Sequence, residues 1–303
     1  MAQQRPSPQF GISIDPAADA PDDPFRRARI ADESGIDLIT SMDHPYNRRL
    51  FDTWTLLTAL ATSTQRVHIG GNVLNLPLRP PAMLAKMAAT LDVLSGGRLE
   101  LGLGAGGIWD GIEAFGGPRR SPGEAYGAFR DALHILRGMW ESAGSSFTYE
   151  GDYYQVRGAR PGPAPAHDIP IWIGATGPRM LHLLGRMADG LLVSYNYHPP
   201  ERLLQFNRWI DEGAEEAGRD ANTIRRGYNL MGVLDLGRDD TTAPGLKDNY
   251  LQGDVSYWVE KIVDWYSDYR QDTFIFWPVA GNQQVQVEAF AREVAPAVRE
   301  ALS

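Results

Sequence analysis

RVHIGGNVLNLPLRPPAMLAKMAATLDVLSGGRLELGLGAGG, residues 66–107, decides the fold, because it contains one complete repeating unit. Its first β-branched residues form a run too short for a helix and predict a strand over residues 67–73. Apolar residues then recur at helical spacing over residues 84–94. Two glycines at 96–97 end that helix, because glycine tolerates left-handed backbone, and a buried strand follows at 98–103. The stretch therefore reads as a βαβ crossover in a parallel sheet.

The strand-and-helix pattern of this stretch recurs along the whole chain. The expected strands lie at residues 10–15, 37–42, 67–73, 98–103, 169–174, 190–194, 226–234 and 273–277. Clear helical patterns lie at about residues 52–64, 123–142, 200–217, 255–269 and 284–301. Eight alternating pairs are typical of an α/β protein of the (β/α)8 TIM-barrel class. Because no linker separates two cores, we expect residues 1–303 to form a single domain with a small hairpin inserted at about 145–157.

The composition is that of a globular protein. Of the 303 residues, 43% are hydrophobic and 22% charged, and no apolar run is long enough to span a bilayer, so no membrane location is expected. The first ten residues contain no leader-like apolar stretch. The absence of cysteine excludes disulfides and thiolate metal sites and favours a reducing compartment, so we expect a cytoplasmic protein. The formal net charge of -9 disfavours nucleic acid as a partner.

A glycine loop follows the strand at 98–103. Gly102, Gly104 and Gly107 match the G-x-G-x-x-G pattern of dinucleotide-binding loops. Such a site needs a helix to begin within the glycines, whereas the glycines and prolines of residues 111–123 predict an irregular chain. A better interpretation is that the missing side chains of Gly104, Gly106 and Gly107 let a flat ring lie close to the backbone. A tight barrel turn is the alternative.

A second glycine-rich segment predicts an anion site. In TIM barrels the chemistry sits at the carboxyl ends of the strands, and one strand ends at Gly174. Ala175 and Gly177 are small enough to expose backbone N–H groups where the next helix begins, Thr176 adds a hydroxyl and Arg179 adds a charge. We predict that this segment binds a phosphate. The alternative is a capped helix start with a solvated arginine.

Another strand ends at Asp43 and His44, which we take as candidate catalytic residues. An imidazole at this place could donate a hydrogen bond or move a proton, because its pKa lies near the working pH. The remaining histidines are expected to be surface or core residues. The sequence contains no H-E-x-x-H pair, no carboxylate cluster and no G-x-S-x-G elbow, so neither a metal site nor serine catalysis is expected.

Taken together, several motifs resemble the bacterial luciferase-like superfamily of flavin and deazaflavin oxidoreductases over about residues 9–300. The motifs are SMDH at 41–44, GGNV at 70–73, ATLDVLSGGRLELGLGAG at 89–106, PIWIGATGPRMLHLLGRMADG at 170–190 and FAREVAPAV at 290–298. The combination is most similar to the branch that uses the deazaflavin coenzyme F420, which includes methylenetetrahydromethanopterin reductase.

The resemblance implies roles for individual residues. It implies a non-proline cis peptide between Asn72 and Val73, forming a bulge behind the cofactor ring; an ordinary trans strand end is the alternative. It places His44 near the reactive ring. We also predict Asp43 as a cofactor contact and Trp109 as a third candidate catalytic residue. The phosphate of the cofactor is expected at the Gly174–Gly177 segment described above.

One departure from the family bears on the substrate. The sugar-phosphate dehydrogenase of the superfamily has a glutamate directly after the glycine loop, whereas this chain has Gly107. This puts sugar-phosphate oxidation in doubt. Trp109, Tyr46, Tyr195 and Trp277 suggest instead a mainly aromatic, uncharged substrate pocket. Barrel packing is the alternative for each of these aromatic residues.

Three functions remain open at this point. The first is an F420-dependent oxidoreductase that transfers a hydride between deazaflavin C5 and a small unsaturated organic substrate. The second is an FMN-dependent luciferase-like monooxygenase, and the third is a non-catalytic deazaflavin-binding protein, suggested by the missing glutamate. The resemblance also implies a homodimer, for which the second and third helices offer the candidate contact residues Trp54, Leu57, Met83 and Met87.

Overall fold

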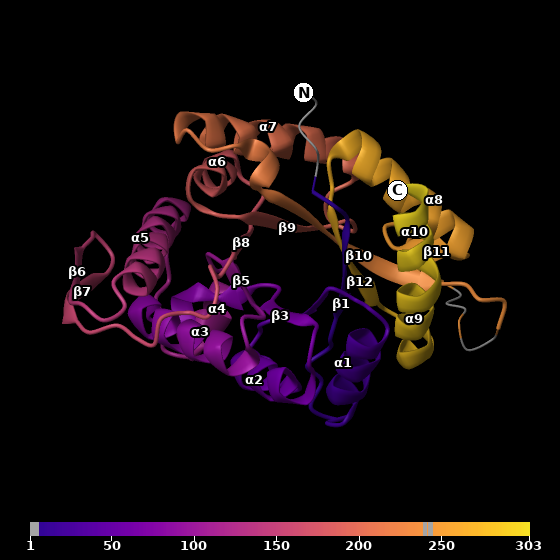
Figure 1. The fold of residues 1–303 in the computed structure, drawn as a ribbon, viewed down its shortest axis with the longest axis horizontal. Coiled ribbons are helices and arrows are strands. Elements are labelled where there is room, and N and C mark those ends of the chain that lie inside the picture. Colours follow the sequence, from indigo (N-terminus) through magenta and orange to yellow (C-terminus); the bar gives the residue numbers. More distant parts are fainter. Residues whose placement is uncertain (1–5, 239–240, 242–244) are drawn as a thin grey trace.

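The computed structural model describes residues 6–238, 241 and 245–303, so the first five residues, considered above for a leader, lie outside it. It confirms the TIM barrel. The barrel strands are β1 (Gln9–Ser13), β2 (Leu38–Ser41), β3 (His68–Gly71), β5 (Leu99–Gly104), β8 (Ile171–Gly174), β9 (Gly190–Ser194), β10 (Arg225–Leu234) and β12 (Thr273–Pro278). Neighbouring strands pair in parallel in this order, and the pairing of β12 with β1 closes the sheet (Figure 1).

Helices surround the strands on the outside (Figure 1). They are α1 (Asp23–Glu33), α2 (Thr53–Ser63), α3 (Pro81–Ser95), α5 (Pro122–Glu141), α6 (Pro178–Met187), α7 (Pro200–Glu216), α8 (Val255–Tyr269), α9 (Gln283–Ala289) and α10 (Ala295–Ala301). A π-helical turn, Phe290–Val294, joins α9 to α10. The helices begin and end at residues that favour helix termini. After α3, Gly96 and Gly97 have left-handed φ angles of 73° and 82°. At the start of α2, the Asp52 side chain accepts a hydrogen bond from the Thr55 N–H.

Several shorter elements lie between the barrel units. They are β4 (Leu74–Asn75), the 3-10 helices η1 (Leu76–Leu78) and η2 (Ala221–Thr223), α4 (Trp109–Ala114), the antiparallel hairpin of β6 (Phe147–Glu150) and β7 (Gln155–Ala159), and β11 (Leu251–Gly253), which pairs with β10. The hairpin lies beside α5 at the edge of the molecule (Figure 1). The prediction of an irregular chain after the glycine loop was wrong for α4. This short helix includes Gly111, one of the glycines that suggested a continuous loop, and ends before Gly116.

Side chains fill the interior of the barrel. Leu38, Trp172, Leu192 and Ile275 come from four different strands and pack together, with Val73 against them. The Trp172 indole N–H donates to Glu100 Oε2 at 2.7 Å, so the polar edge of that ring is satisfied. Because this layer is packed and apolar, a ligand can reach only the open, carboxyl end of the strands.

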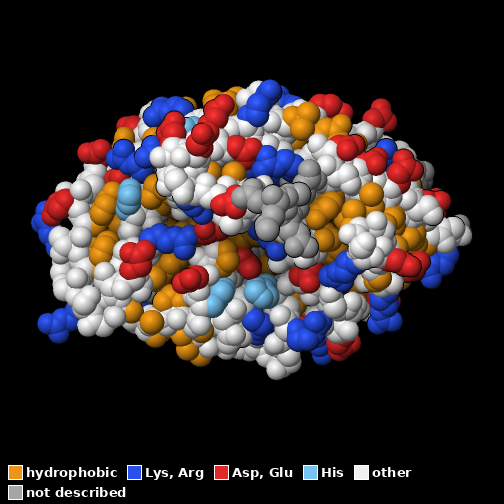
Figure 2. All heavy atoms as spheres, turned by 45° about the horizontal axis from the view of Figure 1, so that its top comes forward, with side chains coloured by type: hydrophobic (Ala, Val, Ile, Leu, Met, Phe, Trp, Pro, Cys, Tyr) orange, Lys and Arg blue, Asp and Glu red, His pale blue; other side chains and the backbone are white. Residues whose placement is uncertain are grey.

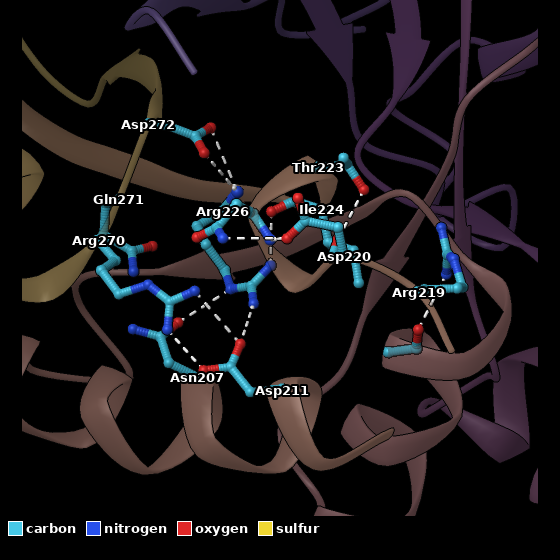
Figure 3. A network of polar contacts seen from close by, with 12 residues as sticks. Asn207, Asp211, Arg219, Asp220, Thr223, Ile224, Arg226, Arg270, Gln271 and Asp272 are labelled. Atoms are coloured by element: carbon cyan, nitrogen blue, oxygen red, sulfur yellow. Dashed lines mark hydrogen bonds and ion pairs between the residues drawn. The ribbon is translucent and has the colours of Figure 1, made fainter. Parts of the chain in front are cut away.

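A buried polar network lies at the opposite, amino end of the strands (Figure 3). The Arg226 side chain is nearly fully buried and donates to Asp211 Oδ1 at 3.1 Å, to Asn207 Oδ1 at 3.0 Å and to the Ile224 carbonyl at 2.6 Å. Asp272 accepts from the Arg226 backbone N–H. Burial lowers the pKa of Arg226 to about 10, and burial also raises the pKa of Asp272. The network therefore joins α7 to the starts of β10 and β12.

The surface carries charges of both signs. On the face shown in Figure 2, acidic and basic side chains lie next to one another with apolar side chains between them. Among the residues that the structure describes, no helix has the length and apolar character needed to cross a bilayer.

Candidate functional site

The centre of the barrel mouth is built around Val73. The peptide bond between Asn72 and Val73 is cis, as the sequence analysis expected. The Val73 side chain lies between β5 and β8, because a Cβ atom added at Gly104 or at Gly174 would lie only 2.7 Å or 3.0 Å from Val73 Cγ2. Gly104 and Gly174, which we predicted to let a ligand approach the backbone, therefore make room for Val73. Val73 itself is half-buried, so part of its apolar side chain is exposed at this end of the barrel.

A row of polar groups holds Asn72. The Asn72 and Asn229 amides bond reciprocally across the barrel, with N–O distances of 2.7 Å and 3.3 Å. Asn229 also donates to the Ser194 hydroxyl at 3.1 Å, which joins β3, β10 and β9 at this level. The sequence analysis missed Asn229 and Ser194. The available signal was a polar residue inside the apolar run of β10.

Asp43 is fixed by its neighbours. Its side chain has no exposed area, its Oδ2 accepts from the Asn75 backbone N–H at 2.7 Å, and both of its oxygens bond to the Arg79 guanidinium. Arg79 also lies 3.4 Å from Asp52. Because both carboxylate oxygens of Asp43 are hydrogen-bonded, this side chain holds the turn after β2 in place. His44 therefore remains the candidate proton donor. Arg79 is not among the site residues predicted from the sequence, because its pairing with Asp43 joins distant segments.

His44 is half-buried and follows directly after Asp43. Its Nδ1 lies 2.9 Å from the Tyr46 hydroxyl, and the two rings are tilted by 48°. No described residue bonds to its Nε2, so this nitrogen is available to a ligand. The pKa of Tyr46 is raised by burial and by the nearby Asp43 charge, so Tyr46 remains a neutral phenol.

The predicted anion site lies at the start of α6. Thr176, Gly177 and Arg179 are exposed, and Gly177 caps the helix without a side-chain hydrogen bond. Within the part of the chain that the structure describes, the Thr176 and Gly177 N–H groups have no acceptor. The Arg179 guanidinium stacks over the Tyr126 ring of α5 at 4.4 Å and has no carboxylate partner among the described residues. Unpaired donors at a helix N-terminus beside a free cation favour an anion.

The glycine loop forms one wall of the mouth. Gly106 has a φ of 98° and lies against the Trp109 ring, because an added Cβ would be 2.9 Å from Trp109 Cη2. Gly107 is exposed and faces open space. Trp109 is half-buried at the start of α4. Its predicted part in the reaction stays a prediction.

Tyr195 does not belong to the predicted aromatic pocket. Its ring packs against Trp265 of α8 at 5.4 Å and against Tyr228 at 6.0 Å, so it fills the layer between the barrel and the outer helices. Tyr195 therefore serves barrel packing, which was the alternative to a place in the substrate pocket. Trp277 is half-buried near the end of β12.

Four of the other five histidines make the following contacts with neighbouring side chains. His68 Nδ1 lies 2.9 Å from Glu100 Oε1, and His167 Nδ1 lies 2.8 Å from the buried Asp92. His182 lies 3.1 Å from Glu216, and His134 stacks on Tyr149. In the described ranges, no group of three or more histidine, aspartate and glutamate side chains is arranged to hold a metal ion.

Known proteins share this architecture and parts of this sequence. Over 219 residues the chain is 34% identical to 5,10-methylenetetrahydromethanopterin reductase of Methanolobus tindarius, covering 71% of this chain and 62% of the relative. Over 229 residues it is 31% identical to F420-dependent glucose-6-phosphate dehydrogenase of Microbacterium testaceum, covering 71% and 65%. The chain thus spans less than two thirds of the length of these curated relatives.

Two solved structures superpose over nearly the whole chain. An F420-dependent secondary alcohol dehydrogenase in complex with an F420-acetone adduct has a TM-score of 0.83 at 20% identity, covering 97% of this chain and 99% of that one. The oxygenating constituent of 3,6-diketocamphane monooxygenase of Pseudomonas putida, in complex with FMN, has a TM-score of 0.75 at 19% identity, covering 96% and 98%. At these identities the likeness concerns the fold.

The family model described as luciferase-like monooxygenase matches residues 6–245, which is most of the barrel. The chain therefore belongs to the luciferase-like monooxygenase family.

Proposed function

We propose that this protein is an F420-dependent oxidoreductase that transfers a hydride between deazaflavin C5 and a small unsaturated organic substrate. The observation that carries the proposal is the set of unpaired N–H donors at Thr176 and Gly177, with Arg179 beside them, next to the apolar Val73 bulge. A flat ring with a phosphate-bearing chain needs this combination of surfaces. The relative named as an F420-dependent glucose-6-phosphate dehydrogenase, which matches 71% of this chain, favours the deazaflavin.

The residues present fit such a cofactor. Val73 would support the ring, Gly106 and Gly107 would border it, and the segment from Ala175 to Arg179 would hold the phosphate. When bound, a deazaflavin supplies two-electron hydride transfer and does not activate oxygen as a flavin does. A second cation, Arg120, stacks on the Tyr154 ring at 5.3 Å without a carboxylate partner among the described residues, which suits an anionic cofactor tail.

The chain's own groups would then serve the substrate. His44 would donate a hydrogen bond or a proton through Nε2, and Trp109 would border the substrate. Asp43 and Arg79 neutralise each other and keep the turn after β2 in place. With Gly107 in place of a glutamate, this part of the mouth offers no carboxylate, so an uncharged substrate is expected.

The phosphate assignment predicts the effect of one substitution. Arg179→Ala should weaken F420 binding about tenfold, which is about 1.4 kcal/mol, because it removes a cation from the anion site. Fluorescence titration of the purified variant would measure this. Arg186→Ala, at the exposed far end of the same helix, is the matched control and should bind as the unaltered protein does. Equal affinity of Arg179→Ala and the unaltered protein would remove the phosphate assignment.

Screening for turnover tests the reaction. Reduced F420 should be oxidised by some member of a panel of enones, imines, ketones and pterin-like compounds. The structural likeness to an FMN-containing monooxygenase supports FMN as the second candidate cofactor, in which case oxygen would be consumed. Tight F420 binding with no turnover on any substrate would instead support a non-catalytic deazaflavin-binding protein. The glycine at position 107, where the sugar-phosphate dehydrogenase has a glutamate, also favours that alternative.

We further propose that the protein is a homodimer formed through α2 and α3. In α3, Met83 (55%), Val93 (44%) and Leu94 (69%) are exposed, and exposed apolar side chains of this size are candidates for an interface. Trp54 of α2 and Met87 of α3 are half-buried. Leu57, which we predicted as a contact residue, was a wrong choice, because it is buried within the chain.

Leu94→Lys should convert the dimer to a monomer, because it places a charge in an apolar interface. Light scattering after gel filtration would measure the mass. Leu204→Lys, a similar change on exposed α7, is the control and should leave the mass unaltered. A monomeric unaltered protein would end the dimer proposal.

A further inference from the structure

We propose that Tyr46 is a positioning residue that keeps neutral His44 in the tautomer with its proton on Nε2. The functional consequence, that Nε2–H is the group offered to the reacting molecules, rests on the proposed function. The tautomer itself does not depend on it. Tyr46 was noted in the sequence only as a possible aromatic wall of the pocket.

The contact between the two side chains is a hydrogen bond of 2.9 Å from the Tyr46 oxygen to His44 Nδ1. Either group could be its donor in principle. Burial and the Asp43 charge raise the pKa of Tyr46, so the phenol keeps its proton across the neutral range. A phenol O–H is a stronger donor than the N–H of a neutral imidazole, and an imidazole nitrogen is a stronger acceptor than a phenol oxygen, so the phenol O–H donates to Nδ1.

An imidazole that accepts at Nδ1 must carry its proton on Nε2 when it is neutral. No described residue accepts a hydrogen bond from Nε2. The one ring nitrogen that can donate is thus the one that the protein leaves unpaired.

The position of the Tyr46 ring is itself fixed by α4. A Cβ atom added at Gly111 would lie 2.6 Å from Tyr46 Cγ and 2.8 Å from Cδ1, so the ring lies directly against the Gly111 backbone. Asp43, three residues before Tyr46 in the same turn, is held by Arg79 and by the Asn75 N–H. The Tyr46 ring is therefore packed against α4 while its hydroxyl contacts His44. This contact accounts for a glycine inside a helix, where glycine is otherwise unfavourable.

The experiment compares the unaltered protein with Tyr46→Phe, which keeps the ring against Gly111 and removes only the hydroxyl. Nitrogen-15 NMR of histidine-labelled protein at about pH 8, above the ordinary histidine pKa, reports which imidazole nitrogen carries the proton. We expect His44 to be in the Nε2–H form in the unaltered protein and in a mixture of both forms in Tyr46→Phe. Tyr195→Phe, the same chemical change at a ring packed away from the mouth, should leave the His44 signals as they are.

A Nδ1–H tautomer in the unaltered protein, or unchanged His44 signals in Tyr46→Phe, would overturn the proposal. Circular dichroism establishes that each variant is folded. Gly111→Ala is a second test of the same contact, because its Cβ should displace the Tyr46 ring and produce the same mixture of tautomers.

Once a substrate is found, Tyr46→Phe should lower kcat about five- to tenfold with F420 affinity unchanged, in line with the loss of one hydrogen bond. Because the NMR measurement needs no cofactor, its failure is distinct from a failure of the proposed function.

Discussion

Replacing Arg226 by methionine should lower the free energy of unfolding by about 3–5 kcal/mol. The guanidinium is nearly fully buried, and each of its three nitrogens donates to an oxygen of the protein. Methionine fills a similar volume but leaves the Asn207 and Ile224 oxygens without their donor and Asp211 with Arg270 as its remaining cation. The loss should be measured by urea unfolding at neutral pH, with the slope compared between variants.

Arg225→Met is the matched control for this change. Arg225 is the neighbouring residue, its side chain is 25% exposed, and it lies 3.5 Å from Asp272. A more exposed and longer ion pair should contribute about 1 kcal/mol or less. If Arg226→Met and Arg225→Met had the same free energy of unfolding, the buried network would contribute no more to stability than the exposed ion pair, which would contradict the prediction.

Replacing His44 by glutamine should lower kcat about 10²- to 10⁴-fold while leaving the dissociation constant for F420 within about threefold. The reason is that glutamine can still donate a hydrogen bond from the same turn but cannot exchange a proton at neutral pH. The phosphate contacts lie on α6, well apart along the chain from the turn after β2, so binding of the cofactor should persist. Turnover and titration of the same preparation measure both quantities.

His134→Gln provides the comparison for this substitution. His134 is exposed on α5 and stacks on Tyr149 of the hairpin, so the same chemical change there should leave kcat unaltered. Full turnover by His44→Gln would show that His44 has no part in proton transfer. A loss of F420 binding by His44→Gln would assign it to the cofactor site instead.

The sequence predicted the barrel closely because the signals that set each element are local. Helix α8 begins and ends where periodicity placed it, and Gly96 and Gly97 adopt the left-handed backbone expected of them. The strands, read from short apolar runs, differ from the structure by only a few residues at each end. Closure of the barrel then follows from eight alternating units.

The site was less predictable because its contacts join distant segments. The glycine pattern indicated an open backbone at Gly104 and Gly174, but only the structure shows that Val73 occupies the space. The pairing of Asn72 with Asn229 spans 157 residues, and no local pattern marks it. Tyr195 faces outward because of its strand register, which an aromatic residue near a strand end does not reveal.

The central claim is that the mouth of this barrel binds a deazaflavin, and a fluorescence titration tests it most directly. The purified protein would be titrated with F420 and with FMN, each in its oxidised and reduced form. Our account predicts a micromolar or tighter dissociation constant for F420 and binding of FMN at least tenfold weaker. Preference for FMN, or binding of neither cofactor, would contradict it.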